Sequence, residues 1–210
     1  MDDYLQRQLK TALEEALADT PVVGILGPRQ CGKSTLAKRH DPKRPYLTLD
    51  DQNYLSLAIE DPQGFVDQLP EQITIDETQR APELTLAIKR NVDANRQPGR
   101  FLLTGSANLL QLPLLADSLA GRIECLYLQP FTASEIEGCE TNFLETWLEN
   151  GITVELAPGS PPAPTSLPER LVAGGYLEAV LSLPQSFQSI PNKEPLKSVQ
   201  SAVDHFNVIL

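Results

Sequence analysis

The sequence predicts an α/β fold in which a parallel β-sheet is flanked by helices. Short apolar segments that are typical of strands alternate along the chain with stretches that have helical spacing of apolar residues. Strands separated by helices require crossover connections, and such connections produce a parallel sheet with both faces covered. The length of 210 residues and the hydrophobic content of 41% suffice for one compact domain.

The first three expected elements are a helix, a strand and a second helix. Leucines at four-residue intervals predict an amphipathic helix over residues 4–18. The apolar run at 22–26 ends at Gly27 and is typical of a buried strand that meets a turn. Residues 33–40 predict a helix with a basic carboxyl end, which is favourable for the helix dipole.

Four further strands and one helix follow in the expected order. Residues 46–50 alternate between apolar and polar side chains, and residues 73–76 form the next apolar segment. Residues 83–95 predict a helix, after which a Pro-Gly turn leads into the apolar strand at 101–106. Residues 123–128 are the last strand candidate.

Composition and charge exclude several classes of protein. With 17 basic and 28 acidic residues the net charge is −11, which disfavours nucleic-acid binding as the main role. The three cysteines lie far apart, a pattern typical of neither a disulfide framework nor a zinc site. We expect no secretory signal, no membrane span and a cytoplasmic location, because no basic start precedes an apolar run and no apolar stretch is long enough.

The most specific motif lies between the first strand and the second helix. Residues 27–34, GPRQCGKS, match the pattern G-x-x-x-x-G-K-[ST]. Its glycines permit a tight turn whose N–H groups face phosphates, its lysine reaches the β and γ phosphates, and its hydroxyl can sit on Mg²⁺. The start of the helix adds a positive field. We therefore expect nucleotide binding by Gly27, Pro28, Arg29, Gln30, Cys31, Gly32, Lys33, Ser34 and Thr35.

A pair of carboxylates follows the strand expected at 73–76. Asp76 and Glu77 lie at its carboxyl end, the edge at which open α/β sheets bind ligands. Asp76 is expected to hold Mg²⁺ through the water shell of the ion, together with Ser34. Glu77 is expected to orient or deprotonate an attacking water. The alternative is that the pair begins a surface turn or caps the next helix.

Three residues further along the chain each have two open interpretations. A hydroxyl of Thr104 or Ser106 could bond the attacking water or the γ-phosphate, or could cap a helix that begins near Asn108. Arg122 could be an arginine finger for the γ-phosphate of a neighbouring subunit. It could equally form a structural ion pair on the surface.

The order of the motifs resembles that of a known family. GPRQCGKSTLAKR, YLTLDD, ITIDETQRAPELTLAIKR, FLLTGSANLL, SLAGRIECLYLQPFTASEIEG and LVAGGYLEAVL follow one another. From about residue 4 to residue 183 the chain resembles prokaryotic AAA+ ATPases, whose nucleotide-binding core precedes a C-terminal domain of unknown function. The resemblance implies a P-loop core of the additional-strand type and ATP as the nucleotide. It assigns Lys33 and Ser34 to Walker A, Asp76 and Glu77 to Walker B, Thr104 and Ser106 to the sensor segment, and Arg122 to the L-x-G-R element.

The last part of the chain departs from this family. The aromatic-rich helical segment and the winged-helix-like domain expected after Ser182 are not recognisable. We therefore predict a core at 1–150, a Pro-rich linker with a helical extension at 151–183, and a divergent, poorly ordered tail at 184–210. On this interpretation the chain is truncated relative to the family.

The expected function is that of an ATP-binding core that hydrolyses ATP with Mg²⁺, with Glu77, Ser106 and Arg122 as catalytic residues. The alternative is a non-catalytic ATP-binding remnant or a regulatory partner without an output domain. A small P-loop kinase fits less well, because no Arg-rich lid follows the third strand. A DNA-binding module is disfavoured by the net charge. A homo-oligomer or an unidentified protein partner is possible.

Overall fold

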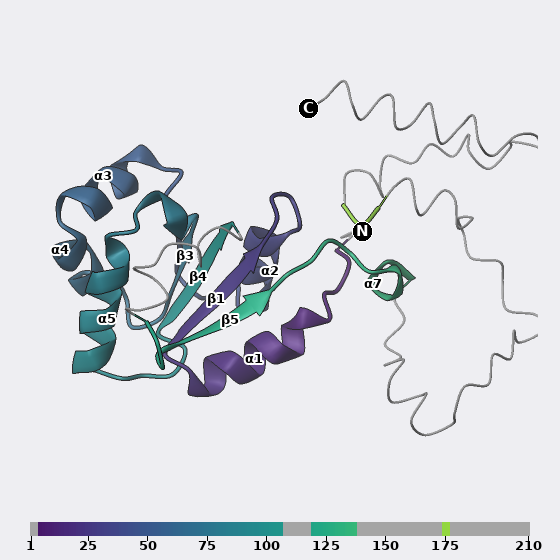
Figure 1. Ribbon diagram of the computed structural model, residues 1–210, viewed down its shortest axis with the longest axis horizontal. Helices are drawn as coiled ribbons and strands as arrows, with labels where there is room; N and C mark the ends of the chain where they lie inside the picture. The colour runs from purple at the N-terminus through teal and green to yellow at the C-terminus, as the bar shows by residue number, and fades with distance from the viewer. Residues whose placement is uncertain (1–3, 107–118, 138–173, 177–210) are drawn as a thin grey trace, which may run out of the picture. The chain divides into compact units, whose positions relative to one another are not determined.

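The computed structural model describes residues 4–106, 119–137 and 174–176. The chain divides after Pro130 into two units, 1–130 and 131–210. The first unit contains a five-stranded sheet with helices on both faces (Figure 1), so the predicted α/β class is confirmed. The strands are β1 (Val22–Gly27), β2 (Tyr46–Thr48), β3 (Ile73–Asp76), β4 (Phe101–Ser106) and β5 (Ile123–Tyr127).

The strand order places three carboxyl ends side by side. The order is β2-β3-β4-β1-β5, and every neighbouring pair is parallel. Strand β4 lies between β1 and β3, which is the additional-strand arrangement that the resemblance implies. In such a sheet, ligands bind outside the carboxyl ends of the strands. The loop after β1, the acid pair after β3 and the polar end of β4 therefore meet at one edge.

Alternation of side chains along the strands creates two cores, one on each face. Helices α1 (Leu9–Asp19) and α2 (Lys33–His40) cover one face, and α3 (Gln52–Glu60), α4 (Pro62–Asp67) and α5 (Leu84–Ala94) cover the other (Figure 1). In β1, Val23 and Ile25 face the first core and Val22 and Leu26 the second. Full burial of one such side chain stabilises the fold by about 1.5–3 kcal/mol.

Most predicted elements occur where the sequence places them. Helix α2 and strands β3 and β4 have the predicted bounds, while β2 ends at Thr48 rather than at residue 50. The early end of β2 is a turn, in which Thr48 accepts hydrogen bonds from the N–H groups of Asp50 and Asp51 at 3.2 Å each. Two helices that the sequence analysis does not predict, α3 and α4, follow this turn.

The first helix begins later than predicted, at Leu9 instead of residue 4. The guanidinium of Arg7 donates to the backbone oxygens of Cys31 at 2.6 Å and Gln129 at 2.5 Å. These bonds tie residues 4–8 to the loop after β1. The tertiary contacts of Arg7 therefore override the helical pattern in this segment.

An aspartate precedes and caps each of the helices α3 and α4. The carboxylate of Asp51 accepts from the N–H of Asn53 at 2.8 Å, and that of Asp61 accepts from the N–H of Gly64 at 2.9 Å. Pro62 occupies the first turn of α4, where its missing N–H has no cost. These caps satisfy N–H groups that have no partner within the helix.

In the second unit, the structure describes one short helix, α7 (Ala133–Glu137). Thr132 and Glu135 cap its start reciprocally, because each side chain accepts a hydrogen bond from the backbone N–H of the other. The boundaries expected near residues 150 and 183 lie outside the described residues. None of the described helices is long and apolar enough to cross a membrane.

Candidate nucleotide-binding site

The loop between β1 and α2 has the backbone shape that its glycines predict. A Cβ on Gly27 would lie 2.1 Å from the backbone oxygen of Leu128, so only glycine fits there. Gly32 precedes α2 with φ of 95°, a conformation that L side chains rarely adopt. Gln30 has φ of 61° and completes the tight turn. The start of α2 thus directs backbone N–H groups and a positive field toward the loop.

Lys33, the first residue of α2, folds back over the loop. Its ammonium donates to the backbone oxygens of Gly27 at 3.1 Å and Pro28 at 2.7 Å, and the side chain is buried. These carbonyl oxygens keep the Lys33 ammonium at the loop. Charged phosphate oxygens bind an ammonium more strongly than neutral carbonyl oxygens do. Of the other predicted loop residues, Arg29, Gln30 and Thr35 are exposed, whereas Cys31 packs into the core on the α2 face.

The end of β3 lies beside the start of α2. The hydroxyl of Ser34 donates to Oδ1 of Asp76 at 3.0 Å, although 42 residues separate them in sequence. The hydroxyl of Thr104 donates to the same oxygen from β4, and Tyr46 donates to Oδ2 from β2 at 2.5 Å. A hydroxyl and a carboxylate in contact form an oxygen donor set that suits the hard cation Mg²⁺. Ser34 and Asp76 thus fit a magnesium ion by the chemistry of their side chains.

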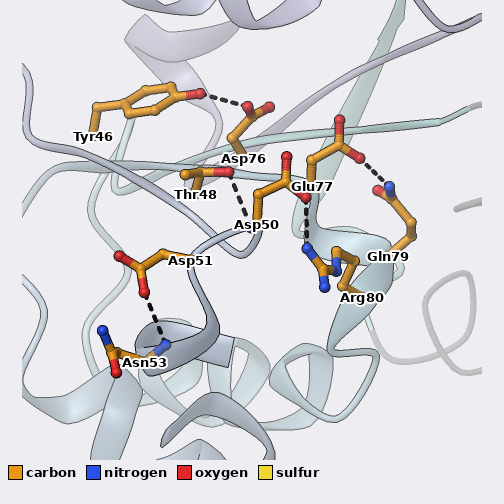
Figure 2. A network of polar contacts seen from close by, with 9 residues as sticks. All are labelled: Tyr46, Thr48, Asp50, Asp51, Asn53, Asp76, Glu77, Gln79 and Arg80. Carbon is orange, nitrogen blue, oxygen red and sulfur yellow. Dashed lines mark hydrogen bonds and ion pairs between the residues drawn. The ribbon is translucent and has the colours of Figure 1, made fainter. Parts of the chain in front are cut away.

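Glu77 points away from Asp76, although it is the next residue. Its backbone is left-handed, with φ of 59° and ψ of 39°, and the turn η1 (Thr78–Arg80) follows it. The carboxylate of Glu77 accepts a hydrogen bond from the side-chain amide of Gln79 (Figure 2). The amide oxygen of Gln79 in turn accepts from the N–H of Ser106 at 3.4 Å. Glu77 is thereby linked to the end of β4.

Bonds on both sides hold η1 in place. The buried hydroxyl of Thr78 donates to the backbone oxygen of Thr104 at 3.0 Å. Arg80 pairs with Asp50 across 2.6 Å, which connects the turn to the segment after β2 (Figure 2). This anchoring fixes the position of Glu77 relative to β2 and β4.

Thr104 and Ser106 play different parts at the end of β4. The hydroxyl of Thr104 is fully buried and is directed at Asp76, so it does not cap a helix. Ser106 is half-buried and offers its backbone N–H to Gln79. The helix expected near Asn108 lies outside the described residues.

Arg122 is not near the phosphate loop. It precedes β5, and its backbone oxygen accepts from the N–H of Val22 at the amino end of β1, whereas the loop follows the carboxyl end of that strand. Its guanidinium pairs with Asp93 at 2.5 Å and donates to the backbone oxygen of Ala120 at 3.0 Å. The hydrogen bond from Arg122 lowers the pKa of Asp93. The structure thus contains the ion pair expected in one interpretation of Arg122.

Three polar residues at this site are missed by sequence reasoning: Arg7, Tyr46 and Gln79. The partners of Arg7 are 24 and 122 residues away, and Tyr46 is 30 residues from Asp76. No local motif signals such pairs. Gln79 is close to the acid pair in sequence, but its second partner lies on another strand. Among the described residues, no cluster of three or more His, Cys, Asp or Glu could hold a metal ion.

The sheet order and the loop define the class: this is a P-loop nucleotide-binding domain. The chain belongs to the AAA domain family, whose model matches residues 19–137. It is 36% identical over 148 residues to the uncharacterized protein Mb2031c of Mycobacterium bovis, and equally to Rv2008c of Mycobacterium tuberculosis. The match covers 70% of this chain and 33% of each relative, so the chain spans about a third of their length.

Two solved structures resemble part of the chain at low sequence identity. The Walker-type ATPase paby2304 of Pyrococcus abyssi is 18% identical with a TM-score of 0.44, over 73% of this chain and 61% of that one. A RuvB variant of Thermotoga maritima is 21% identical with a TM-score of 0.36, over 66% of this chain and 49% of that one.

Proposed function

We propose that this chain hydrolyses ATP with Mg²⁺ and that water is the acceptor of the phosphoryl group. Lys33 binds the β and γ phosphates, and the loop N–H groups surround them. Ser34 and Asp76 hold the metal, and Glu77 orients the attacking water. This assignment gives one task to each of the four motif residues at the edge of the sheet.

The observation that carries the proposal is the contact between Ser34 and Asp76. Two motifs that are 42 residues apart place a hydroxyl and a carboxylate 3.0 Å from each other, next to the lysine of the loop. A surface turn or a helix cap would not require this contact. The pairing of a loop hydroxyl with the carboxylate that ends a strand is the arrangement used to hold Mg²⁺ in P-loop proteins.

In the proposed reaction the water oxygen forms a bond to the γ-phosphorus. The bond from that phosphorus to the β–γ bridging oxygen breaks, and ADP leaves with the electron pair. Glu77 accepts a proton from the water, and inorganic phosphate is the second product. Mg²⁺ held by Ser34 and Asp76 would neutralise charge on the β and γ phosphates. Gln79 and η1 hold Glu77 at the end of β3.

The test measures ATP binding and phosphate release separately on the purified chain. We expect Mg²⁺-dependent release by the wild type. Lys33→Ala should weaken binding by about 10- to 100-fold, because a charge-assisted contact contributes about 1.5–3 kcal/mol. Glu77→Gln should retain binding and lose about 10²–10⁴-fold in turnover. Glu60→Gln, at an exposed glutamate of α3, is the matched control and should change neither.

Each possible result has a different meaning. Turnover that survives Glu77→Gln would remove Glu77 from the mechanism. Binding of ATP without any turnover by the wild type would favour a non-catalytic binder or regulatory partner instead. The chain spans about a third of the length of its relatives. The proposal therefore includes the case in which a partner or a second copy contributes a residue to the ATP site.

Arg122 and Ser106 have proposed roles within this reaction. Since Arg122 lies at the opposite edge of the sheet from its own loop, it can stabilise only the γ-phosphate of a neighbouring molecule. Ser106 lies at the end of β4, beside the Gln79 that holds Glu77, where its hydroxyl can bond the attacking water.

A further inference from the structure

We infer that Tyr46 is a positioning residue that fixes the orientation of the Asp76 carboxylate for the metal ion. The inference rests on the proposed Mg²⁺ role of Ser34 and Asp76. It assigns to a residue of β2 a task for which the sequence motifs give no signal. Two features of the structure carry it: the hydrogen bonds of Asp76 and the placement of the Tyr46 ring.

The first feature is the division of donors between the two oxygens of Asp76. Oδ1 accepts from both Ser34 and Thr104, whereas Tyr46 is the donor that the structure gives Oδ2. The Tyr46 bond is short, at 2.5 Å. Donors on one oxygen alone would leave the other free to swing about the bond between Cβ and Cγ. The Tyr46 hydroxyl stops this rotation, so the carboxylate plane is fixed.

The second feature is the position of the Tyr46 ring between two functional elements. Tyr46 begins β2 and pairs with Thr74, two residues before Asp76, so its long side chain runs along the sheet toward the end of β3. The ammonium of Lys38 lies 4.2 Å from the ring centroid. Lys38 belongs to α2, the helix that begins with Lys33 and Ser34. Tyr46 thus connects the helix of the phosphate loop to the carboxylate (Figure 2 shows the Tyr46–Asp76 bond).

Loss of such a positioning group changes the affinity for the metal ion. Removal of a group that orients a metal ligand without contacting the metal typically costs about 10- to 100-fold in metal affinity. Such a group does not contact the nucleotide. Loss of the Tyr46 hydroxyl should therefore weaken Mg²⁺ binding and leave nucleotide binding in the absence of Mg²⁺ unchanged.

The test is Tyr46→Phe, which keeps the ring and removes only the hydroxyl. A fluorescent non-hydrolysable ATP analogue is bound to the protein in EDTA and then in rising Mg²⁺, so that the half-saturating Mg²⁺ concentration is read from binding. Tyr54→Phe, in which an exposed tyrosine of α3 loses the same atom, is the matched control. We expect the half-saturating Mg²⁺ concentration to rise about 10- to 100-fold in Tyr46→Phe only.

The affinity for the analogue in EDTA separates a positioning role from a structural one. Equal affinity for the wild type and Tyr46→Phe, together with the raised Mg²⁺ requirement, supports the inference. An unchanged Mg²⁺ requirement in Tyr46→Phe overturns it, and so does an equal loss of affinity with and without Mg²⁺. A wild type whose analogue binding does not respond to Mg²⁺ overturns the proposed metal site itself, and the inference with it.

Discussion

At the scale of single residues, the left-handed backbone of Glu77 separates two adjacent carboxylates. Without that turn, Glu77 would leave the strand on the opposite face from Asp76 and would not be directed along the sheet edge toward Gln79. The conformation costs roughly 1–2 kcal/mol for a residue other than glycine. The bonds of η1 to β4 and to Asp50 offset this cost. The carboxylate of Asp76 is then surrounded by hydroxyl groups, whereas that of Glu77 contacts the side-chain amide of Gln79.

The environment of Glu77 leads to a prediction for Gln79. Gln79→Leu keeps the size of the side chain but removes the amide that holds the carboxylate. We expect kcat for ATP hydrolysis to fall about 10- to 100-fold, because misplacement of a reacting group by about 1 Å has effects of that order. KM and ATP affinity should not change.

Steady-state kinetics of Gln79→Leu and of Gln68→Leu, an exposed control after α4, check this prediction. A fall in ATP affinity equal to the fall in kcat would show that Gln79 acts on the loop and not on Glu77. Gln79→Asn, which keeps the amide, should recover part of kcat.

How far the sequence predicts the site depends on whether a residue's role is local. Lys33, Ser34 and Asp76 belong to motifs whose spacing already specifies the chemistry. Tyr46 and Arg7 act through partners on other elements, and their positions follow only from the packing of the whole unit. Even the ion pair of Arg122 with Asp93 needs the fold, because 29 residues separate the two.

At the scale of elements, the helices between β2 and β3 are signalled in the sequence by capping aspartates and not by a clear apolar periodicity. The sequence predicts β1, β3 and β4 because apolar runs end there at glycine or acidic residues, and it predicts α2 from its basic carboxyl end. Helix α3 escapes prediction because Tyr54, Leu57 and Ile59 are apolar but exposed, which obscures the buried stripe. Its clearest local signal is the aspartate at position 51.

The cap of α3 can be tested directly. Asp51→Ala removes the acceptor of the Asn53 N–H and should reduce the free energy of unfolding by about 1 kcal/mol. Urea unfolding followed by circular dichroism measures this change. Asp51→Ser supplies another capping oxygen and should restore most of the loss. An equal loss in both variants would mean that the negative charge, and not the cap, stabilises the helix.

At the scale of the whole molecule, the phosphate loop and Arg122 lie at opposite edges of one sheet. A second copy would bring Arg122 to the loop if the sheet edge at which the strands of one molecule begin faced the loop of the next molecule. An arginine supplied in this way contributes on the order of 10³-fold or more to phosphoryl transfer. Turnover per chain should then rise with protein concentration.

Mixing two inactive variants tests this arrangement. Arg122→Ala retains Glu77, and Glu77→Gln retains Arg122, so a mixed assembly contains sites that have both groups. We expect ATP turnover to recover in the mixture, while Arg122→Ala mixed with the double variant stays inactive. Full activity of Arg122→Ala alone would instead assign Arg122 to the structural pair with Asp93.

The most direct test of the central claim is ATP hydrolysis in water enriched in oxygen-18, with Mg²⁺ present and then with EDTA. Mass spectrometry of the products reports which molecule accepted the phosphoryl group. The proposed reaction predicts one solvent oxygen in the released phosphate, none in ADP, and no product in EDTA. Bound ATP without labelled phosphate would contradict the claim and point to a non-catalytic binder. Formation of ADP without labelled phosphate would point to transfer to another acceptor.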